Sequence, residues 1–204
     1  GLVGSEMCIR DRNLTDEEAD RIKPVNFAEN KTFQELKQMV EWFKERFGYV
    51  IGDINWQGVL NVALDLRGDK IFIDMMQNQE RARRLFSAIT ETIKEFVGYI
   101  KGETGTSSIS VNRTIKFFNP ELNLHSNCSV VMISPNMYQD LLLEYNTELS
   151  RVLQPYGIHH CGNNMHLHAA GYARVKGASF FDVGWGSEIS LCRQKLPEVF
   201  LNLR

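Results

Sequence analysis

The sequence lacks several features that would point to particular classes of protein. It has no apolar run long enough to cross a bilayer and no signal-peptide pattern at its start. Its formal net charge of −2 over 204 residues gives no reason to expect a nucleic acid or an anionic membrane as a partner. A glycine-rich phosphate loop and a G-x-S-x-G nucleophile motif are both missing. We therefore expect neither a membrane protein nor a nucleic-acid-binding protein.

Cysteine is scarce as well. The four cysteines, Cys8, Cys128, Cys161 and Cys192, are scattered without the spacing of a disulfide framework. With 43% hydrophobic residues, a chain of this length can bury a sizeable core without disulfide bonds. A reducing cytoplasm is therefore the expected compartment.

The first twelve residues, "GLVGSEMCIRDR", are treated separately. They resemble the peptide encoded by sequencing-adapter DNA at the end of a metagenomic fragment, and the alternative is a disordered native tail. Residues 13–204 are expected to form one domain. The ending "EVFLNLR" stops inside a strand pattern, so we expect the sequence to be cut at both ends.

The remaining chain shows the pattern of an α/β protein. Capping-box spacings at Thr15 and Thr32 predict two helix starts, and Ser134-Pro135 predicts a third. From residue 128 onward, strands over 128–133, 157–161, 179–183 and 199–203 alternate with helices over 135–149, 164–175 and 187–195. The first half has helical patterns over 32–47, 59–66 and 79–102, strand candidates at 49–54 and 107–112, and an irregular segment at 113–124. This alternation predicts a parallel sheet, either a doubly wound open sheet or part of a (β/α)₈ barrel.

The stretch "GIHHCGNNMHLH" holds four of the five histidines. On a strand, His159 and Cys161 share one face and His160 points to the other. An imidazole and a thiolate side by side suit Zn²⁺. The alternative is a buried strand end with a satisfied histidine and an inert cysteine. His166 and His168 diverge on a predicted helix, where we expect them to be solvated or packed against a neighbouring helix.

A second feature is a set of polar residues at predicted strand ends, where sites gather in parallel α/β folds. The set comprises Asp53, Asn55, Asn112, His125, Asn127, Asp182 and Asn202. We expect these side chains to line one polar pocket, with Trp56 and Trp185 as possible walls. Each residue taken alone can equally be a turn or capping residue. Cys192 is a poor further metal ligand, because it falls on the apolar face of a predicted helix.

Four segments together resemble the uroporphyrinogen decarboxylase superfamily. They are "WQGVLNVALDLRGDKIFIDMMQNQERARRLF", "SVVMISPNMYQDLLLEYNTEL", "GIHHCGN" and "GSEISLCRQKLPEVFLNLR". The match runs from about residue 50 to the end, and it lies in the order and spacing of the segments. It implies a (β/α)₈ barrel, here a partial TIM barrel.

The resemblance offers two activities. In the methylcobalamin:coenzyme M methyltransferase branch, a zinc ion held by a His-x-Cys pair and a later cysteine activates a thiol, and His159 and Cys161 match that pair. The third ligand of that branch would lie beyond Arg204, because Cys192 comes too early. The decarboxylase itself is not known for a His-x-Cys here, which favours the methyltransferase branch. Its arginine-rich substrate-binding segment near the amino terminus is also not found.

We therefore expect a zinc-dependent, corrinoid-linked methyltransferase that acts on a thiol, with methylcobalamin carried by a corrinoid protein. Asp53, His125 and Asp182 are the expected catalytic residues. The expected substrate-binding residues are Asn55, Asn112, Asn127, Trp185 and Asn202, of which Asn202 matches the asparagine of a late strand in the family. The alternatives are a metal-free decarboxylase that uses His159 as a pocket donor, and a non-catalytic barrel that binds a tetrapyrrole or a corrinoid. We do not expect the isolated chain to be stable or active, because a barrel that lacks strands exposes unpaired edges.

Overall fold

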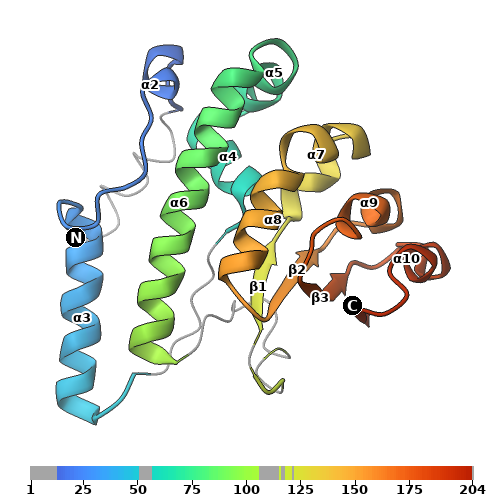
Figure 1. Ribbon diagram of the computed structural model, residues 1–204. Helices are drawn as coiled ribbons and strands as arrows, with labels where there is room; N and C mark the ends of the chain where they lie inside the picture. Colours follow the sequence, from blue (N-terminus) through green and yellow to red (C-terminus); the bar gives the residue numbers. More distant parts are fainter. Residues whose placement is uncertain (1–12, 51–56, 106–114, 116–117, 121, 204) are drawn as a thin grey trace.

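The computed structural model describes residues 13–50, 57–105, 115, 118–120 and 122–203, in which a helical first half precedes a half built on a parallel sheet (Figure 1). The helices are α2 (Asp16–Asp20), α3 (Lys31–Phe47), α4 (Val59–Arg67), α5 (Lys70–Gln77), α6 (Gln79–Thr104), the 3₁₀ helix η2 (Cys128–Met132), α7 (Pro135–Leu141), α8 (Leu143–Val152), α9 (Met165–Tyr172) and α10 (Ile189–Lys195). The strands are β1 (Asn123–Ser126), β2 (Tyr156–His160), β3 (Ala178–Val183) and β4 (Phe200–Leu203).

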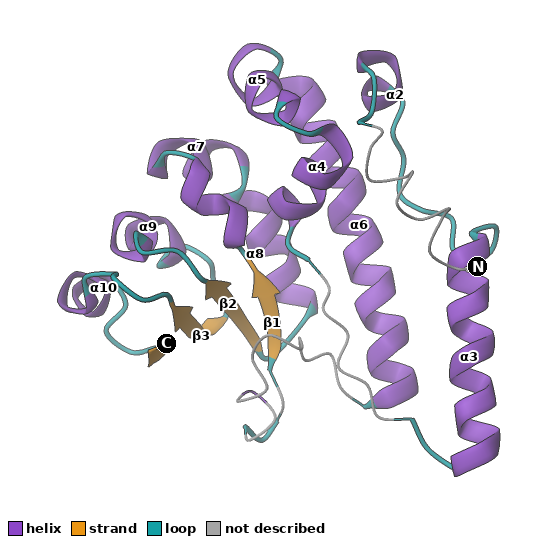
Figure 2. Ribbon diagram, turned by 180° about the vertical axis from the view of Figure 1, so that it is seen from behind, coloured by secondary structure: helices purple, strands orange, loops and turns teal. Residues whose placement is uncertain are grey.

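The sheet confirms the predicted α/β class. Its strands lie in the order β1-β2-β3-β4, and every pair is parallel. Helices α7 to α10, which connect the strands, lie on one side of the sheet (Figures 1 and 2). Right-handed crossovers that always step in the same direction place their helices on one face. The four described strands therefore lack the order reversal of a doubly wound sheet.

One predicted strand is wrong. Residues Cys128–Met132 form the helix η2 instead, and the strand lies at 123–126, where it overlaps the end of the segment 113–124 that is predicted to be irregular. The hydrogen-bond ladder between β1 and β2 ends where the Asn127 amide donates to the carbonyl of His159. The Val130 amide then donates to the carbonyl of Asn127, which begins the helical turn. The Ser129 amide donates to Asn61 Oδ1 of α4 at 2.9 Å. These contacts override the strand propensity of the β-branched run.

The helix starts are mostly as predicted. Thr15 forms a complete capping box with Glu18, and Ser134 caps α7 with Pro135 in its first turn. The prediction at Thr32 is wrong, because Asn30 caps α3 through the amide of Phe33. The predicted strand at 107–112 and most of the one at 49–54 lie outside the described residues.

A buried ion-pair network fixes the helical half. Arg67, at the end of α4, is only 1% exposed, and its Nε donates to Asp74 Oδ2 of α5 at 2.8 Å. Arg81 of α6 donates to the other oxygen of Asp74 at 3.2 Å and to both oxygens of Asp20 in α2. Because a buried guanidinium requires hydrogen-bonded partners, these contacts hold α2, α4, α5 and α6 in one arrangement.

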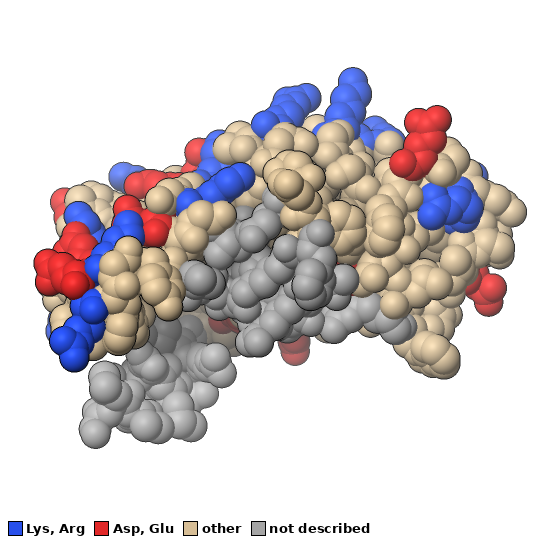
Figure 3. Space-filling model, turned by 90° about the horizontal axis from the view of Figure 1, so that it is seen from below, with Lys and Arg blue, Asp and Glu red and all other residues tan. Residues whose placement is uncertain are grey.

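The outer surface carries charges of both signs. Seen from below, the described residues show Lys and Arg side chains interspersed with Asp and Glu (Figure 3). None of the described helices is both long and apolar enough to span a membrane.

Replacing Arg67 with methionine tests the buried network. Arg67→Met leaves Asp74 with Arg81 as its cationic partner, so we expect a loss of about 3 kcal/mol in the free energy of unfolding. The measurement is urea unfolding followed by circular dichroism. Lys31→Met is the control, because Lys31 and Glu35 form an exposed pair 3.9 Å apart, and it should change stability by less than about 0.5 kcal/mol. Equal unfolding free energies for the two variants would contradict a structural role of the network.

Candidate metal centre

Strand register places four polar residues in one row across the sheet. Ser126 is the register partner of His159, His159 of Asp182, and Asp182 of Asn202. Register partners in parallel strands lie at the same level and point to the same face. The row therefore crosses β1, β2, β3 and β4 on the face opposite the connecting helices.

Hydrogen bonds join three members of this row. Asn202 Nδ2 donates to Asp182 Oδ1 at 2.7 Å, and Asp182 Oδ2 lies 2.6 Å from His159 Nδ1. An ionised carboxylate only accepts hydrogen bonds, so Nδ1 of His159 carries the proton. The Nε2 atom of the same ring then points away from Asp182 and is left for another partner.

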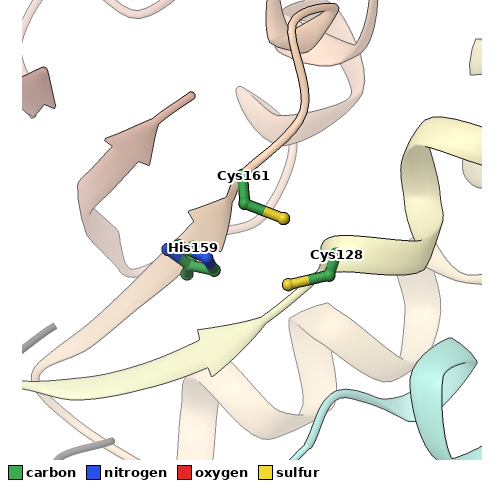
Figure 4. A group of neighbouring side chains, drawn as sticks. All are labelled: Cys128, His159 and Cys161. Atoms are coloured by element: carbon green, nitrogen blue, oxygen red, sulfur yellow. The ribbon is translucent and has the colours of Figure 1, made fainter. Parts of the chain in front are cut away.

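Two cysteines meet His159 on its other side. The ligand atoms of Cys128, His159 and Cys161 all lie within 4.8 Å of one another. Figure 4 shows the two sulfur atoms and the imidazole ring facing a common space, with Cys128 at the start of η2 and Cys161 just after β2. His159 is buried, Cys128 is partly buried and Cys161 is exposed. Two sulfurs and an imidazole nitrogen are a ligand set suited to zinc.

Backbone packing fixes the position of Cys161. Gly184 follows β3, and its amide donates to the carbonyl of His160. A Cβ atom at this position would lie 2.5 Å from the carbonyl oxygen of Cys161 and 2.4 Å from that of Gly162. Only glycine permits this close approach of the two strand ends.

Cys128 lies outside the ligand set that the sequence predicts, in which the third ligand comes beyond Arg204. The predicted strand at 128–133 is the reason, because a cysteine that opens a strand does not lie at the carboxyl edge of the sheet. With β1 at Asn123–Ser126, Cys128 comes two residues after one strand and Cys161 directly after the next. The carboxyl ends of adjacent parallel strands meet at one edge, so this pairing is readable from the sequence once the strand is correctly placed.

Electrostatic effects in the group favour a cysteine thiolate beside a charged imidazole. A hydrogen bond with Cys161, assisted by His159 and Ser126 against the opposing effect of burial, lowers the pKa of Cys128 to about 3. Burial lowers the pKa of His159, but the hydrogen bonds with Asp182 and Cys128 outweigh it and raise that pKa to about 9. A thiolate, an imidazole and a carboxylate arranged in this order also occur in enzymes that use a cysteine as the nucleophile. The second sulfur, at Cys161, has no role in such a nucleophile, whereas it is a natural ligand for a metal.

The other histidines of "GIHHCGNNMHLH" face the helices. His160 Nδ1 lies 2.8 Å from the hydroxyl of Tyr172, and its Nε2 lies 2.9 Å from Asn164 Oδ1. His168 is buried against the rings of His160 and Tyr172. The His166 ring accepts a hydrogen bond from the backbone of Glu188 at 3.2 Å. Of these histidines, only His159 belongs to the metal-ligand group.

The expected common pocket does not include His125 or Asn127. His125 is the register partner of Ile158, so it points to the face opposite Ser126. It is fully buried with its ring 5.9 Å from that of Tyr156, and burial lowers its pKa to about 3. Asn127 Nδ2 donates to Asn146 Oδ1 of α8 at 2.7 Å. The structure thus brings both side chains to the helical layer, away from the ligand group.

The remaining predicted residues have different positions. Trp185 is 86% exposed and forms no wall of the ligand group. Cys192 is buried in the core and burial raises its pKa, in agreement with its rejection as a ligand. Asp53, Asn55, Trp56 and Asn112 lie outside the described residues.

Comparisons with known proteins bear on the fold. No known family profile matches the chain, and no curated protein matches it. Among solved structures, it is similar to a methyltransferase from Methanosarcina mazei, with a TM-score of 0.53 and 14% sequence identity. The similarity covers 78% of this chain and 46% of that protein, so the chain spans about half its length. The likeness shows that the chain shares the α/β fold of the matched part of that protein.

The buried histidines predict acid sensitivity of the metal-free chain. Burial, with smaller contributions from His160 and His166, lowers the pKa of His168 from 6.5 to about 4. Below pH 6.5 the unfolded chain binds a proton at this position that the folded chain does not, so stability falls as pH decreases towards 4. His168→Leu should make this decline shallower by up to about 1.4 kcal/mol per pH unit. Urea unfolding across this pH range, with a chelator present, measures it, and equal slopes for variant and wild type would refute it.

Proposed function

We propose that this protein is a zinc-dependent methyltransferase that acts on a thiol, with methylcobalamin carried by a corrinoid protein as the methyl donor. The observation that carries the proposal is the meeting of Cys128, His159 and Cys161 within 4.8 Å at one edge of the sheet. The fold that the chain shares with the Methanosarcina mazei methyltransferase supports it. The resemblance of the sequence to the uroporphyrinogen decarboxylase superfamily points in the same direction.

The proposal includes a partial (β/α)₈ barrel. Sequential parallel strands with their connecting helices on one side are the arrangement of such a barrel. Enzymes with this fold place their sites at the carboxyl ends of the strands. Cys128 and Cys161 both follow strand ends at that edge.

The ligand group fits zinc in chemistry and in spacing. With Zn–S bonds of about 2.3 Å and Zn–N bonds of about 2.0–2.1 Å, the ligand atoms of a tetrahedral site lie about 3.3–3.8 Å apart. Atoms within 4.8 Å of one another therefore need side-chain adjustments of about 1 Å to hold an ion. The three ligands found among the described residues would leave a fourth position for an acceptor thiol, as in catalytic rather than structural zinc sites. When bound, zinc would lower the pKa of an acceptor thiol and hold it as a thiolate.

The side chains of the protein have separate tasks in this proposal. Cys128 and Cys161 supply thiolate donors, and His159 supplies Nε2 because Asp182 occupies Nδ1. Methylcobalamin on the partner protein would supply the methyl group. The acceptor thiol would give up its proton to solvent and its sulfur would bond to the methyl carbon, while cobalt would keep the electron pair of the broken cobalt–carbon bond. The exposure of Cys161 leaves the ligand group reachable from solvent.

Metal content tests the proposal. We expect the purified full chain to hold one zinc ion, and Cys128→Ser and Cys161→Ser each to reduce zinc content at least tenfold in the presence of a competing chelator. Cys192→Ser is the matched control, because Cys192 lies buried in α10, and it should retain the metal. The measurement is elemental analysis after dialysis. A wild type without zinc, or serine variants with unchanged zinc, would contradict the proposal.

Two other functions remain distinguishable by experiment. A decarboxylase-like enzyme would use His159 as a pocket donor and need no metal. A non-catalytic corrinoid-binding or tetrapyrrole-binding protein would show no turnover with a methylated corrinoid and a thiol. Zinc binding separates the proposed enzyme from the first, and methylation of a thiol separates it from the second.

A further inference from the structure

We propose that Asp182 and Asn202 are positioning residues of the metal centre, which orient the imidazole of His159 so that Nε2 faces the two cysteine sulfurs. This inference rests on the proposed metal-binding function. It gives the two residues roles other than those expected from the sequence, which were catalysis for Asp182 and substrate binding for Asn202.

Asp182 lies between His159 and Asn202 and forms a hydrogen bond with each of them. Asp182 Oδ2 is 2.6 Å from His159 Nδ1, and Asp182 Oδ1 accepts a hydrogen bond of 2.7 Å from Asn202 Nδ2. The three residues are register partners on β2, β3 and β4. Their contacts are therefore fixed by the backbone ladder and do not depend on a flexible loop.

The Asp182 carboxylate is buried between its neighbouring strands. Asp182 is 0% exposed, and each of its carboxylate oxygens is engaged by a neighbouring strand. A carboxylate held in this way is not open to a substrate. Asn202 is partly exposed and directs its amide nitrogen to Asp182. Asp182 thus acts on His159 and not on a molecule in the site, and Asn202 acts on His159 through Asp182.

In the ligand group, His159 is the residue whose ring must be oriented so that Nε2 faces the metal position. It is the only imidazole in the ligand group of Cys128, His159 and Cys161. A histidine ring has two nitrogens, and only one tautomer leaves Nε2 free to bind a metal. A carboxylate on the other nitrogen fixes both the tautomer and the direction of the ring, and loss of such a partner typically weakens metal binding by about 10–100-fold.

The amide and carboxylate chemistry allows a sharp test. A carboxylate accepts hydrogen bonds on both oxygens, whereas an amide has only one accepting oxygen. Asp182→Asn therefore keeps both bonds only if the Asn202 amide turns over so that its oxygen accepts, and in either case it removes the negative charge beside His159. Asn202→Asp places a second carboxylate against Asp182. Combining Asp182→Asn with Asn202→Asp restores both bonds, because the amide can accept from His159 and donate to the new carboxylate.

The experiment measures zinc affinity of the full chain by competition with a chromogenic chelator, and the visible spectrum of the Co²⁺-loaded chain. We expect each single variant to bind zinc about 10–100-fold more weakly and to show altered cobalt ligand-field bands. The combined variant should bind zinc at least tenfold more tightly than Asp182→Asn does. A general loss of stability would not produce this reciprocal recovery.

Asp74→Asn is the matched control. Asp74 is also a buried aspartate, but its partners are Arg67 and Arg81 in the helical half. This variant should lower the unfolding free energy without changing zinc affinity or the cobalt spectrum. If Asp182→Asn does not fold, Asn202→Leu, which removes only the amide donor, provides the comparison and should weaken zinc binding several-fold.

The outcomes separate this inference from the proposed function. Wild-type binding of zinc with unchanged affinity and spectrum in Asp182→Asn, or no recovery in the combined variant, overturns the positioning role alone. No binding of zinc or cobalt by the wild type overturns the proposed function and this inference with it. In the metal-free chain above pH 9, where the His159 ring is neutral, nitrogen NMR should show its proton on Nδ1 in the wild type and a changed tautomer population in Asp182→Asn.

Discussion

The hydrogen bond between His159 and Asp182 links the chemistry of the site to the architecture of the sheet. The two residues are register partners, so the bond exists only while β2 and β3 pair as they do. A slip of one residue would turn one side chain to the opposite face. The parallel register is therefore the constraint on which the candidate centre depends, and Ser126 and Asn202 extend it to the outer strands.

The end of β2 is held from both faces. On one face His159 contacts Asp182, and on the other His160 is fixed between Tyr172 and Asn164 of the helical layer. Satisfied buried polar groups of this kind rigidify a structure, because breaking any one of them leaves a buried donor or acceptor without a partner. Cys161 comes directly after this rigid segment, where the close approach of Gly184 fixes its backbone. The ligand group is thus largely organised by the backbone and by neighbouring side chains.

Much of this organisation follows from local sequence patterns. Alternation along a strand is enough to place His159 and Cys161 together and His160 apart. Cys128 could not be found in the same way, because the β-branched run after it predicts a strand, whereas contacts with Asn61 and Asn127 turn it into a 3₁₀ helix. The position of His125 depended on the same strand boundary. Its side chain faces the helices because of register, which a single sequence does not reveal.

The separate roles of Asp182 and Asn202 also required the structure. Both are recognisable as polar residues at strand ends, but only the structure shows that they are hydrogen-bonded to each other. A sequence shows which strand ends carry polar groups. It does not show which groups satisfy one another, since that depends on distances between strands far apart in the chain.

X-ray absorption spectroscopy of the zinc-loaded full chain would identify the atoms that surround the metal. We predict a first shell with two sulfur neighbours and at least one nitrogen, from Cys128, Cys161 and His159. A shell made only of nitrogen and oxygen, or one with a single sulfur, would contradict it.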